Sequence, residues 1–533
     1  MYLNCHTCFS LKYGVMPVKA LLAEAQVNGV KALALTDINN TSACPDFARI
    51  APRYGIKPIV GIEFRNGAAL QYIGIARNND GYRELNEHLT NHLVTEKDFS
   101  EKAPPFENAF VIYPFGRKHV DNLRENEFIG VHPSNLTLLR ISRFRQYGQK
   151  LVAHFPVTFR NKTDFNTHRL LRTIDLNTLL SKLPRNEQGM ENEIMLPEKE
   201  LCALYKDFPE IMENTRNLLE QSHIDFQFGK SKNKKVFFAH EAEDREQLRT
   251  LAEQGLAYRY DNPSPKIRER LEMELKTIYD LGFTSYFLIN WDIVRYAERK
   301  GYFYVGRGSG ANSLVAYCLK ITDVDPVELD LYFERFINPS RKNPPDFDID
   351  FSWKDRDDVT RYIFEKHGEK NTALLATYST FQRKAAIREL GKVFGLPDYE
   401  IEKLEAVIAK GNYNLKNFDY YQRLIHDYSQ QIHGLPSHLS IHAGGVLISE
   451  KPMANYTALH LPPKGFLTTQ FSMLEAEDIG LYKFDILSQR GLGHIKDAIS
   501  IIRQNRGEEV DIHDIPKFKR DKLVKKLLRT GQT

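Results

Sequence analysis

The sequence predicts a multidomain protein of combined α/β and α+β architecture. The first observation behind this prediction is length, because 533 residues correspond to about three or four domains at roughly 150 residues each. The second is the alternation of short apolar strands with amphipathic helices through the first quarter of the chain, which is typical of a largely parallel sheet. The third is a change near residue 262, beyond which charged helices surround isolated strands.

Composition excludes several classes of protein. Hydrophobic residues make up 42% and charged residues 27% of the chain, which is ordinary globular usage and excludes disordered and fibrous chains. The net charge of +4 is too small to identify a partner, so any nucleic-acid surface must be local. Five cysteines are an odd number, which argues for a reducing, cytoplasmic setting. No apolar run approaches the roughly 20 residues that a membrane span requires, so no membrane contact is expected.

Periodicity predicts the individual elements. Apolar runs predict strands at residues 2–6, 32–35, 59–64, 111–113, 128–131 and 151–154. Helical spacing predicts helices at residues 18–26, 164–181, 268–279 and 286–300, with Gly301 capping the last. Residues 184–235 mix proline with polar residues and are expected to connect domains. Residues 380–432 are charged and helical, and residues 515–533 are expected to form a basic helix.

A glycine-rich loop is the first candidate for chemistry. A predicted strand at residues 302–305 leads into residues 306–313 (Gly-Arg-Gly-Ser-Gly-Ala-Asn-Ser) and then an apolar helix at 314–319. Glycines allow close backbone approach, and a helix N-terminus offers free N–H groups to an anion. Arg307 adds a fixed cation, so the pattern predicts phosphate binding. A loose dinucleotide fingerprint and a ligand-free turn are the alternatives.

Residues 345–351 (Pro-Asp-Phe-Asp-Ile-Asp-Phe) alternate strictly. Side chains in a strand alternate faces, so Asp346, Asp348 and Asp350 are expected to share one face, opposite apolar side chains. Carboxylates placed so closely repel each other and favour a bound cation such as Mg²⁺. A solvated edge strand is the alternative interpretation.

A second apolar strand, at residues 480–487, contains only two charged residues. Lys483 and Asp485 are expected on one face, and a simple ion pair between them is the alternative to a functional role. Together with the glycine loop and the aspartates, they match the needs of two-metal nucleotidyl transfer. In that reaction one ion lowers the pKa of an attacking 3′-hydroxyl and the other stabilises the departing pyrophosphate.

These motifs resemble the palm of the bacterial replicative DNA polymerase III alpha (C-family) polymerases. The resemblance continues through residues 306–326, 333–339 (Phe-Glu-Arg-Phe-Ile-Asn-Pro), 345–351, 442–446 (His-Ala-Gly-Gly-Val) and 483–485 (Lys-Phe-Asp), in that order. Ordered agreement over about 180 residues is specific, and the resemblance spans essentially the whole chain. It implies a polymerase-beta-like nucleotidyltransferase palm with an inserted helical thumb.

The resemblance also implies residue roles. The aspartates expected to be catalytic and to bind two Mg²⁺ ions are Asp348, Asp350 and Asp485. The residues expected to contact the triphosphate are Arg307, Gly308, Ser309, Arg335 and Lys483. Asp346 is expected to play a supporting role. The thumb cations Lys384, Arg388 and Lys392 are expected either to meet backbone phosphates or to form a solvated face.

Residues 1–265 resemble the PHP (polymerase and histidinol phosphatase) domain of the family, a distorted (β/α)7 barrel with a metal-dependent phosphoesterase site in its active form. His6, Asp37 and Glu63 match that site. Asn4 and Ile38 stand where histidines are typical, and Gln71 stands where a histidine is common. Because Ile cannot ligate a metal, the metal cluster and any 3′–5′ exonuclease activity are expected to be lost.

The resemblance sets boundaries and partners. It implies a PHP domain at 1–265, a palm at 266–378 and 441–505, a thumb at 379–440 and the start of the fingers at 506–533. Expected partners are primer–template DNA, dNTP, a sliding clamp, a clamp loader and a separate proofreading exonuclease. The chain is expected to be a fragment of a DNA-directed DNA polymerase, weak or inactive alone. The alternatives are a PHP-type phosphoesterase, a non-catalytic replisome scaffold and a dinucleotide oxidoreductase.

Overall fold

The computed structural model describes residues 1–116, 122–337, 345–411, 413–512 and 514–531. The chain divides into two compact units. Unit 1 comprises Met1–Lys230, Ala376–Ile441 and Met453–Ile479, and unit 2 comprises Ser231–Leu375, His442–Pro452 and Gly480–Thr533. Within the described part of the chain, no helix combines the length and the apolar composition needed to cross a membrane.

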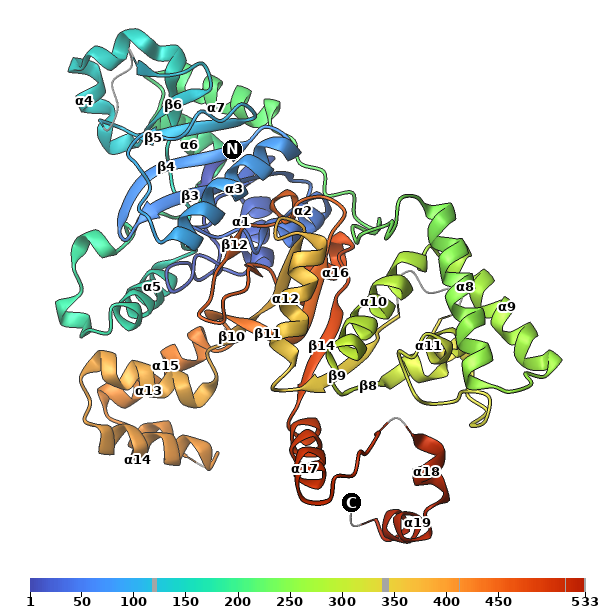
Figure 1. Cartoon of the computed structure of the whole chain (residues 1–533). Helices are drawn as coiled ribbons and strands as arrows, with labels where there is room; N and C mark the ends of the chain where they lie inside the picture. Colours follow the sequence, from blue (N-terminus) through green and yellow to red (C-terminus); the bar gives the residue numbers. More distant parts are fainter. Residues whose placement is uncertain (117–121, 338–344, 412, 513, 532–533) are drawn as a thin grey trace. The chain divides into compact units, whose positions relative to one another are not determined.

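Unit 1 contains a seven-stranded sheet whose spatial order follows the sequence (Figure 1). Its strands are β1 (Tyr2–Cys5), β2 (Ala32–Leu35), β3 (Lys57–Asn66), β4 (Ala69–Ala76), β5 (Ala109–Pro114), β6 (Glu127–Val131) and β7 (Leu151–Ala153). The pairs β1–β2, β2–β3, β5–β6 and β6–β7 are parallel, as the alternation of strands and helices predicts. Strand β4 was not predicted and is antiparallel to both neighbours, because only a two-residue turn containing Gly67 (φ 56°) separates it from β3.

The sheet of unit 1 curls into a half-barrel. Val157, just beyond β7, forms an isolated parallel bridge with β1. The backbone N–H of His6 donates to the Val157 carbonyl at 2.9 Å, and the Val157 N–H donates to the Asn4 carbonyl at 3.0 Å. The chain that follows the last strand therefore satisfies the backbone of the first strand.

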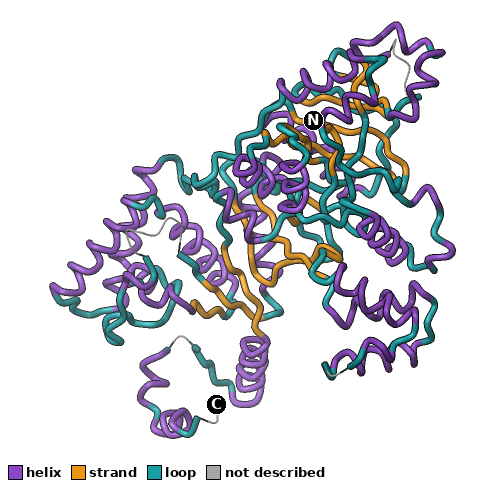
Figure 2. Tube along the Cα trace, turned by 180° about the vertical axis from the view of Figure 1, so that it is seen from behind, coloured by secondary structure: helices purple, strands orange, loops and turns teal. Residues whose placement is uncertain are grey.

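Helices cover this sheet and form a separate group in the same unit. The helices of the first segment are α1 (Val18–Val27), α2 (Cys44–Ile50), α3 (Asn79–Thr95), α4 (Leu136–Ile141), α5 (Lys162–Asp175), α6 (Glu198–Leu204) and α7 (Pro209–Gln221). The later elements are α13 (Arg383–Phe394), α14 (Asp398–Ala409), α15 (Tyr420–Ile432), α16 (Met473–Ile479), β12 (Leu459–His460) and β13 (Thr468–Thr469). Helix α13 packs against both α14 and α15; the three are labelled in Figure 1, and Figure 2 shows from behind how helices and strands are distributed along the chain.

Two expectations for unit 1 need correction. Residues 184–235 are not merely a connection, because they contain α6 and α7, and α7 packs against β7 through a buried apolar face that includes Ile211 and Leu218. The helix expected at 164–181 ends at Asp175. The helix does not continue to residue 181 because Asn177, with φ 46°, lies outside the helical conformation.

Unit 2 is built on a smaller group of strands with order β11-β14-β9-β8. Its strands are β8 (Tyr304–Arg307), β9 (Asp348–Ser352) and β14 (Phe484–Gln489), together with parts of β10 (Thr372–Thr380) and β11 (Pro436–Ile448), which continue into unit 1. Its helices are α8 (Glu241–Arg259), α9 (Pro265–Asp280), α10 (Thr284–Lys300), α11 (Leu314–Cys318), α12 (Arg356–His367), α17 (Arg490–Arg506), α18 (Ile515–Arg520) and α19 (Lys522–Arg529). Helix α12 packs against β14, and α17 packs against β9.

The helix boundaries of unit 2 follow their capping residues. Gly301 caps α10 in the left-handed region (φ 67°), as predicted. The basic helix expected at 515–533 is two helices, because the carboxylate of Asp521 accepts the N–H groups of Leu523 and Val524 and starts α19 anew. Gln532 and Thr533 lie outside the described residues.

We expect His88 of α3 to make unit 1 sensitive to acid. Its ring lies among Phe64, Phe99 and Phe106, and its Nε2 is 2.7 Å from the Tyr72 hydroxyl. Burial lowers the pKa of His88 to about 4. Because the unfolded chain takes up this proton near pH 6.5, stability is full above pH 6.5 and falls as the pH approaches 4.

The H88Q variant keeps a hydrogen-bond acceptor for Tyr72 but does not titrate. Between pH 7 and pH 4.5, the free energy of unfolding measured with a chemical denaturant should fall by on the order of 2 kcal/mol more for the wild type than for this variant. Parallel pH dependences for the two proteins would contradict the expectation.

Candidate active site

The carboxylates of unit 2 are brought together by strand register. Strands β9 and β14 are parallel neighbours in which Asp348 is directly opposite Asp485, while Asp350 lies two residues further along β9. Paired residues on adjacent strands project to the same face, and the strands lie about 4.8 Å apart. Asp350 and Asp485 are buried, and Asp348 is partly exposed. Three carboxylates therefore share one sheet face, whereas sequence alternation predicted Asp346, Asp348 and Asp350 for such a face and could not place Asp485 beside them.

Arg307 neutralises the two aspartates of β9. Strand β8 is antiparallel to β9, with Arg307 opposite Asp348. The Arg307 guanidinium donates from Nε to Asp350 Oδ2 at 2.7 Å and from Nη1 to Asp348 Oδ2 at 3.0 Å. Burial raises the pKa of Asp348 and the neighbouring Asp485 adds to this, with Arg307 opposing both. Arg307, which the sequence predicts to bind phosphate, therefore contacts the aspartates in the structure.

Lys483 neutralises Asp485 in the same manner. Its ammonium forms an ion pair with Asp485 and lies 3.9 Å from Asp346 Oδ1. Burial lowers the pKa of Lys483, but the bond to Asp485 outweighs it and leaves the pKa raised. Asp346 precedes β9 and is exposed. The expectation that it belongs to the aspartate strand is therefore wrong, since regular pairing begins only at Asp348.

The aspartates retain unused ligand capacity. Asp350 Oδ1 and Asp485 Oδ1 are buried and have no hydrogen-bond partner among the described residues. An unsatisfied buried carboxylate oxygen is unfavourable, and a hard divalent cation is the ligand that suits it. In the described part of the chain, no group of three or more His, Cys, Asp or Glu is already assembled to hold a metal, since Arg307 and Lys483 hold the aspartates. The donor set itself fits a divalent cation.

The glycine loop forms a short turn, η7 (Gly308–Asn312), directly after β8. Gly308 has φ 78°, and a Cβ atom there would lie 3.0 Å from Asp348 Oδ2. Glycine is therefore required both by the backbone conformation and by the nearby carboxylate. The hydroxyl of Ser309 donates to the Asp346 carbonyl at 3.4 Å, and Ser309 is half-buried.

The helix after the loop does not offer free N–H groups to a phosphate, which corrects the sequence-based expectation. Helix α11 has only five residues. The buried carboxylate of Glu274, on α9, accepts the backbone N–H groups of Leu314 at 3.0 Å and Val315 at 3.1 Å, and the Ser313 hydroxyl at 2.9 Å. Arg270 pairs with Glu274 at 3.0 Å. An internal carboxylate thus takes the place expected for a bound anion.

Arg335 lies on the turn η8 (Phe333–Arg335), which packs beside η7. Its side chain is exposed. The motif that contains it continues through Asn338 and Pro339, which lie outside the described residues. The structure therefore places Arg335 near the glycine loop and shows no contact between it and the aspartates.

Three further residues support the aspartate strands. Tyr286 of α10 stacks on Phe347 and Phe484, with ring centroids 5.7 Å and 4.8 Å apart. Arg356 donates to the carbonyls of Ile486 and Ala443, both at 3.1 Å. These two residues join segments far apart in sequence, so periodicity could not reveal their contacts. His442, within the 442–446 motif, accepts through Nδ1 the N–H of Gly445, the residue opposite Asp485, at 2.9 Å.

The surviving residues of the N-terminal site lie in unit 1. His6, Asp37 and Glu63 are all buried and lie toward the carboxyl ends of β1, β2 and β3. His6 Nε2 is 3.0 Å from Glu63 Oε2. Asp37 instead accepts hydrogen bonds from Thr7 and Ser10. The structure therefore brings His6 and Glu63 into contact and gives Asp37 separate partners.

The predicted thumb cations have partners of their own. Lys384 and Arg388 of α13 reach the Glu405 carboxylate of α14, at 3.6 Å and 3.1 Å. Lys392 pairs with Glu389 at 3.0 Å on the same helix. All three cations remain substantially exposed, so these pairs are weak and compete poorly with an external phosphate.

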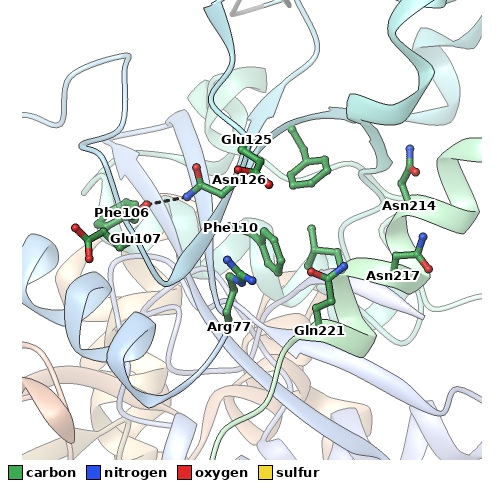
Figure 3. A pocket seen from close by; sticks show the side chains of 11 residues that line it. Arg77, Phe106, Glu107, Phe110, Glu125, Asn126, Asn214, Asn217 and Gln221 are labelled. Atoms are coloured by element: carbon green, nitrogen blue, oxygen red, sulfur yellow. Dashed lines mark hydrogen bonds between the residues drawn. The ribbon is translucent and has the colours of Figure 1, made fainter.

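An open pocket of about 420 Å³ lies in unit 1 beside β5, β6 and α7 (Figure 3). The rings of Phe110 and Phe128 meet edge to face with centroids 5.8 Å apart, and the Arg77 guanidinium lies over Phe110 at 5.1 Å. Asn126 donates to the Phe106 carbonyl at 2.9 Å. None of the predicted site residues lines this pocket, so it belongs to neither candidate site.

Replacing Glu274 with alanine should destabilise unit 2 by on the order of 3 kcal/mol, because three donors and Arg270 would lose a buried partner. Glu272, on the same helix, provides a matched control, since it is exposed and forms its ion pair with Arg249 near the surface. The E272A variant should lose less than about 1 kcal/mol. Denaturant unfolding measures both, and equal losses would contradict the capping role.

The comparisons with known proteins agree with this geometry. The family model for the bacterial DNA polymerase III alpha NTPase domain matches residues 246–488, and that for the PHP domain matches residues 3–127. An error-prone DNA polymerase of Symbiobacterium thermophilum is 30% identical over 97% of this chain and 53% of its own length. The DNA polymerase III subunit alpha of Bacillus subtilis is 29% identical over 100% of this chain and 52% of its own, and that of Borreliella burgdorferi is 30% identical over 94% and 49%.

The chain therefore spans about half the length of the curated relatives that it matches. The PHP match includes His6, Asp37 and Glu63. The polymerase match, which follows it in the sequence, includes Asp348, Asp350 and Asp485. From this agreement of sequence, site geometry and relatives, we conclude that the chain belongs to the bacterial DNA polymerase III alpha family.

Proposed function

We propose that this chain carries the nucleotidyl-transfer site of a DNA-directed DNA polymerase, which joins a dNTP to a primer 3′-hydroxyl. The observation that carries the proposal is the register of β9 and β14, which sets Asp348 beside Asp485 and leaves two buried carboxylate oxygens without partners. A stabilising ion-pair network alone would leave no such oxygens. The relatives named as DNA polymerases support the same reaction.

Asp348, Asp350 and Asp485 would hold two Mg²⁺ ions. When bound, these ions would activate the 3′-hydroxyl and stabilise the pyrophosphate leaving group. Arg307 and Lys483 now neutralise the aspartates, and both become available to the triphosphate once the aspartates have other cations. Lys483 is tightly positioned by burial, whereas Arg307 is 47% exposed and can swing outward.

The other triphosphate contacts in the proposal are Gly308, Ser309 and Arg335. Gly308 lets the backbone approach Asp348 closely, because a Cβ atom at this position would lie 3.0 Å from Asp348 Oδ2. Arg335 is exposed and Ser309 is half-buried, and the two lie on neighbouring turns. Gly308 would hold the phosphates by backbone contact and the other two by side-chain contact.

We further propose a division into domains, in which residues 1–265 form a PHP domain of distorted (β/α)7-barrel type and residues 266–378 and 441–505 form a polymerase-beta-like palm. Residues 379–440 would form the inserted helical thumb, and residues 506–533 would begin the fingers. The helical group α13–α15 between β10 and β11 supports the insertion. Lys384, Arg388 and Lys392 would exchange their weak ion pairs for DNA phosphates.

The complete protein would act in the cytoplasm on primer–template DNA. Its expected partners are a sliding clamp, a clamp loader and a proofreading exonuclease subunit. The N-terminal domain would serve as a structural platform, since Asn4 and Ile38 replace potential metal ligands. A PHP-type phosphoesterase, a scaffold and an oxidoreductase each leave the three clustered aspartates unexplained.

We expect D348N and D485N to reduce Mg²⁺-dependent primer extension by the complete protein on the order of 10³-fold, because each removes a metal ligand. DNA affinity should be unchanged, since neither side chain is part of the phosphate-binding thumb. Primer extension in a gel assay and fluorescence anisotropy measure the two properties.

D346N is the matched control, because Asp346 belongs to the same segment but is exposed and precedes the strand. It should retain activity within a few fold of wild type. Full activity in D485N, or a loss in D346N as large as in D348N, would reject the assignment.

A further inference from the structure

The N-terminal site differs from the palm in how its carboxylates are satisfied. Glu63 is fully buried, and each of its oxygens has a donor. Oε2 accepts from Asn4 Nδ2 at 2.6 Å and from His6 Nε2 at 3.0 Å, while Oε1 accepts from Arg65 Nε. A metal ion would need the lone pairs of these carboxylate oxygens, but three N–H groups already occupy them.

We propose that Arg65 is an internal cation that replaces a metal ion and closes this site to metals.

Arg65 is well placed for this role. It lies two residues after Glu63 on β3, across an irregularity in the β3–β4 register between Phe64 and Arg65, and the ion pair shows that the two side chains meet. Its guanidinium lies over the Tyr13 ring at 4.6 Å. The Arg65 guanidinium forms an ion pair with Glu63, so a cation of the protein already lies beside this buried carboxylate.

The rest of the site offers little to a metal. Asp37 accepts from the Thr7 N–H at 2.7 Å, the Thr7 hydroxyl at 2.6 Å and the Ser10 hydroxyl at 2.7 Å. Neither Asp37 nor Glu63 has an orphaned oxygen, in contrast to Asp350 and Asp485. A metal ligand at either residue would have to displace existing protein donors.

The remaining potential ligand is blocked by an amide. Burial lowers the pKa of His154 to about 4, so its imidazole is neutral and able to ligate. Its Nε2, however, lies 3.4 Å from Asn4 Nδ2, the group that also donates to Glu63. Ile38 and Arg65 line the adjoining pocket of about 410 Å³, and neither can ligate a metal. A divalent cation bound to Glu63 would also lie close to the positive charge of Arg65 and be repelled by it.

The first test measures the coupling between Arg65 and Glu63 by thermal unfolding of the 533-residue chain. R65M and E63Q should each lower the unfolding temperature by on the order of 5 °C, because each removes one member of the Arg65–Glu63 ion pair and leaves the other charge inside the protein without that partner. The E63Q/R65M double variant should be more stable than either single variant, since both charges are gone. This outcome also separates lost pairing from general misfolding.

The exposed pair Arg140–Asp207 of the same unit is the matched control. R140M, D207N and their combination should shift the unfolding temperature by about 1 °C or less. Additive losses at Arg65 and Glu63, with the double variant the least stable of the set, would overturn the proposal.

The second test measures metal directly and is independent of the proposed polymerase activity. All proteins would carry D348N and D485N, so that the palm contributes no metal. After incubation with Zn²⁺ or Mn²⁺ and gel filtration, elemental analysis should find far less than one equivalent per chain, and EDTA should leave the unfolding temperature unchanged. One retained equivalent that disappears in the E63Q background would overturn the proposal.

Discussion

The parallel register between β9 and β14 is the constraint on which the active-site structure depends. It sets Asp348 opposite Asp485 and, with Asp350, gathers three carboxylates on one sheet face. Such proximity is unfavourable unless positive charge is supplied. Arg307 and Lys483 supply it in the structure, and Gly308 leaves the space that Asp348 occupies. Tyr286 and Arg356 brace the strands behind this face. The surrounding contacts can thus be understood as consequences of one strand pairing.

The two units treat buried carboxylates in opposite ways. In unit 2, Asp350 and Asp485 each keep a buried oxygen without a hydrogen-bond partner among the described residues, which leaves room for a cation. In unit 1, the oxygens of Asp37 and Glu63 are occupied by protein donors. The distinction is physical rather than one of composition, because both sites contain acidic residues. A carboxylate can receive a metal only where the fold has left its oxygens unsatisfied or held by side chains able to move.

The glycine loop shows how a sequence motif can be correct in location and incomplete in mechanism. The loop does follow a strand and lie against the aspartates, as predicted. The helix after it is capped from within by Glu274, so it is not the anion site that the motif suggested. Its role is to hold the loop rigidly against α9. Arg307, at the start of the loop, is held by Asp348 and Asp350 in the structure.

The sequence by itself determined the local features of this protein. Alternation placed Asp348 and Asp350 on one face, apolar runs located strands such as β2, and ordered motifs indicated the family to which the relatives also point. It could not place Asp485 beside Asp348, show that β4 pairs antiparallel, or reveal the contacts of Glu274 and Arg65. Periodicity reports which face a side chain occupies within one element, because that depends only on local backbone geometry. Which elements become neighbours, and in what register, depends on long-range packing and hydrogen bonding, and only the tertiary structure decided it.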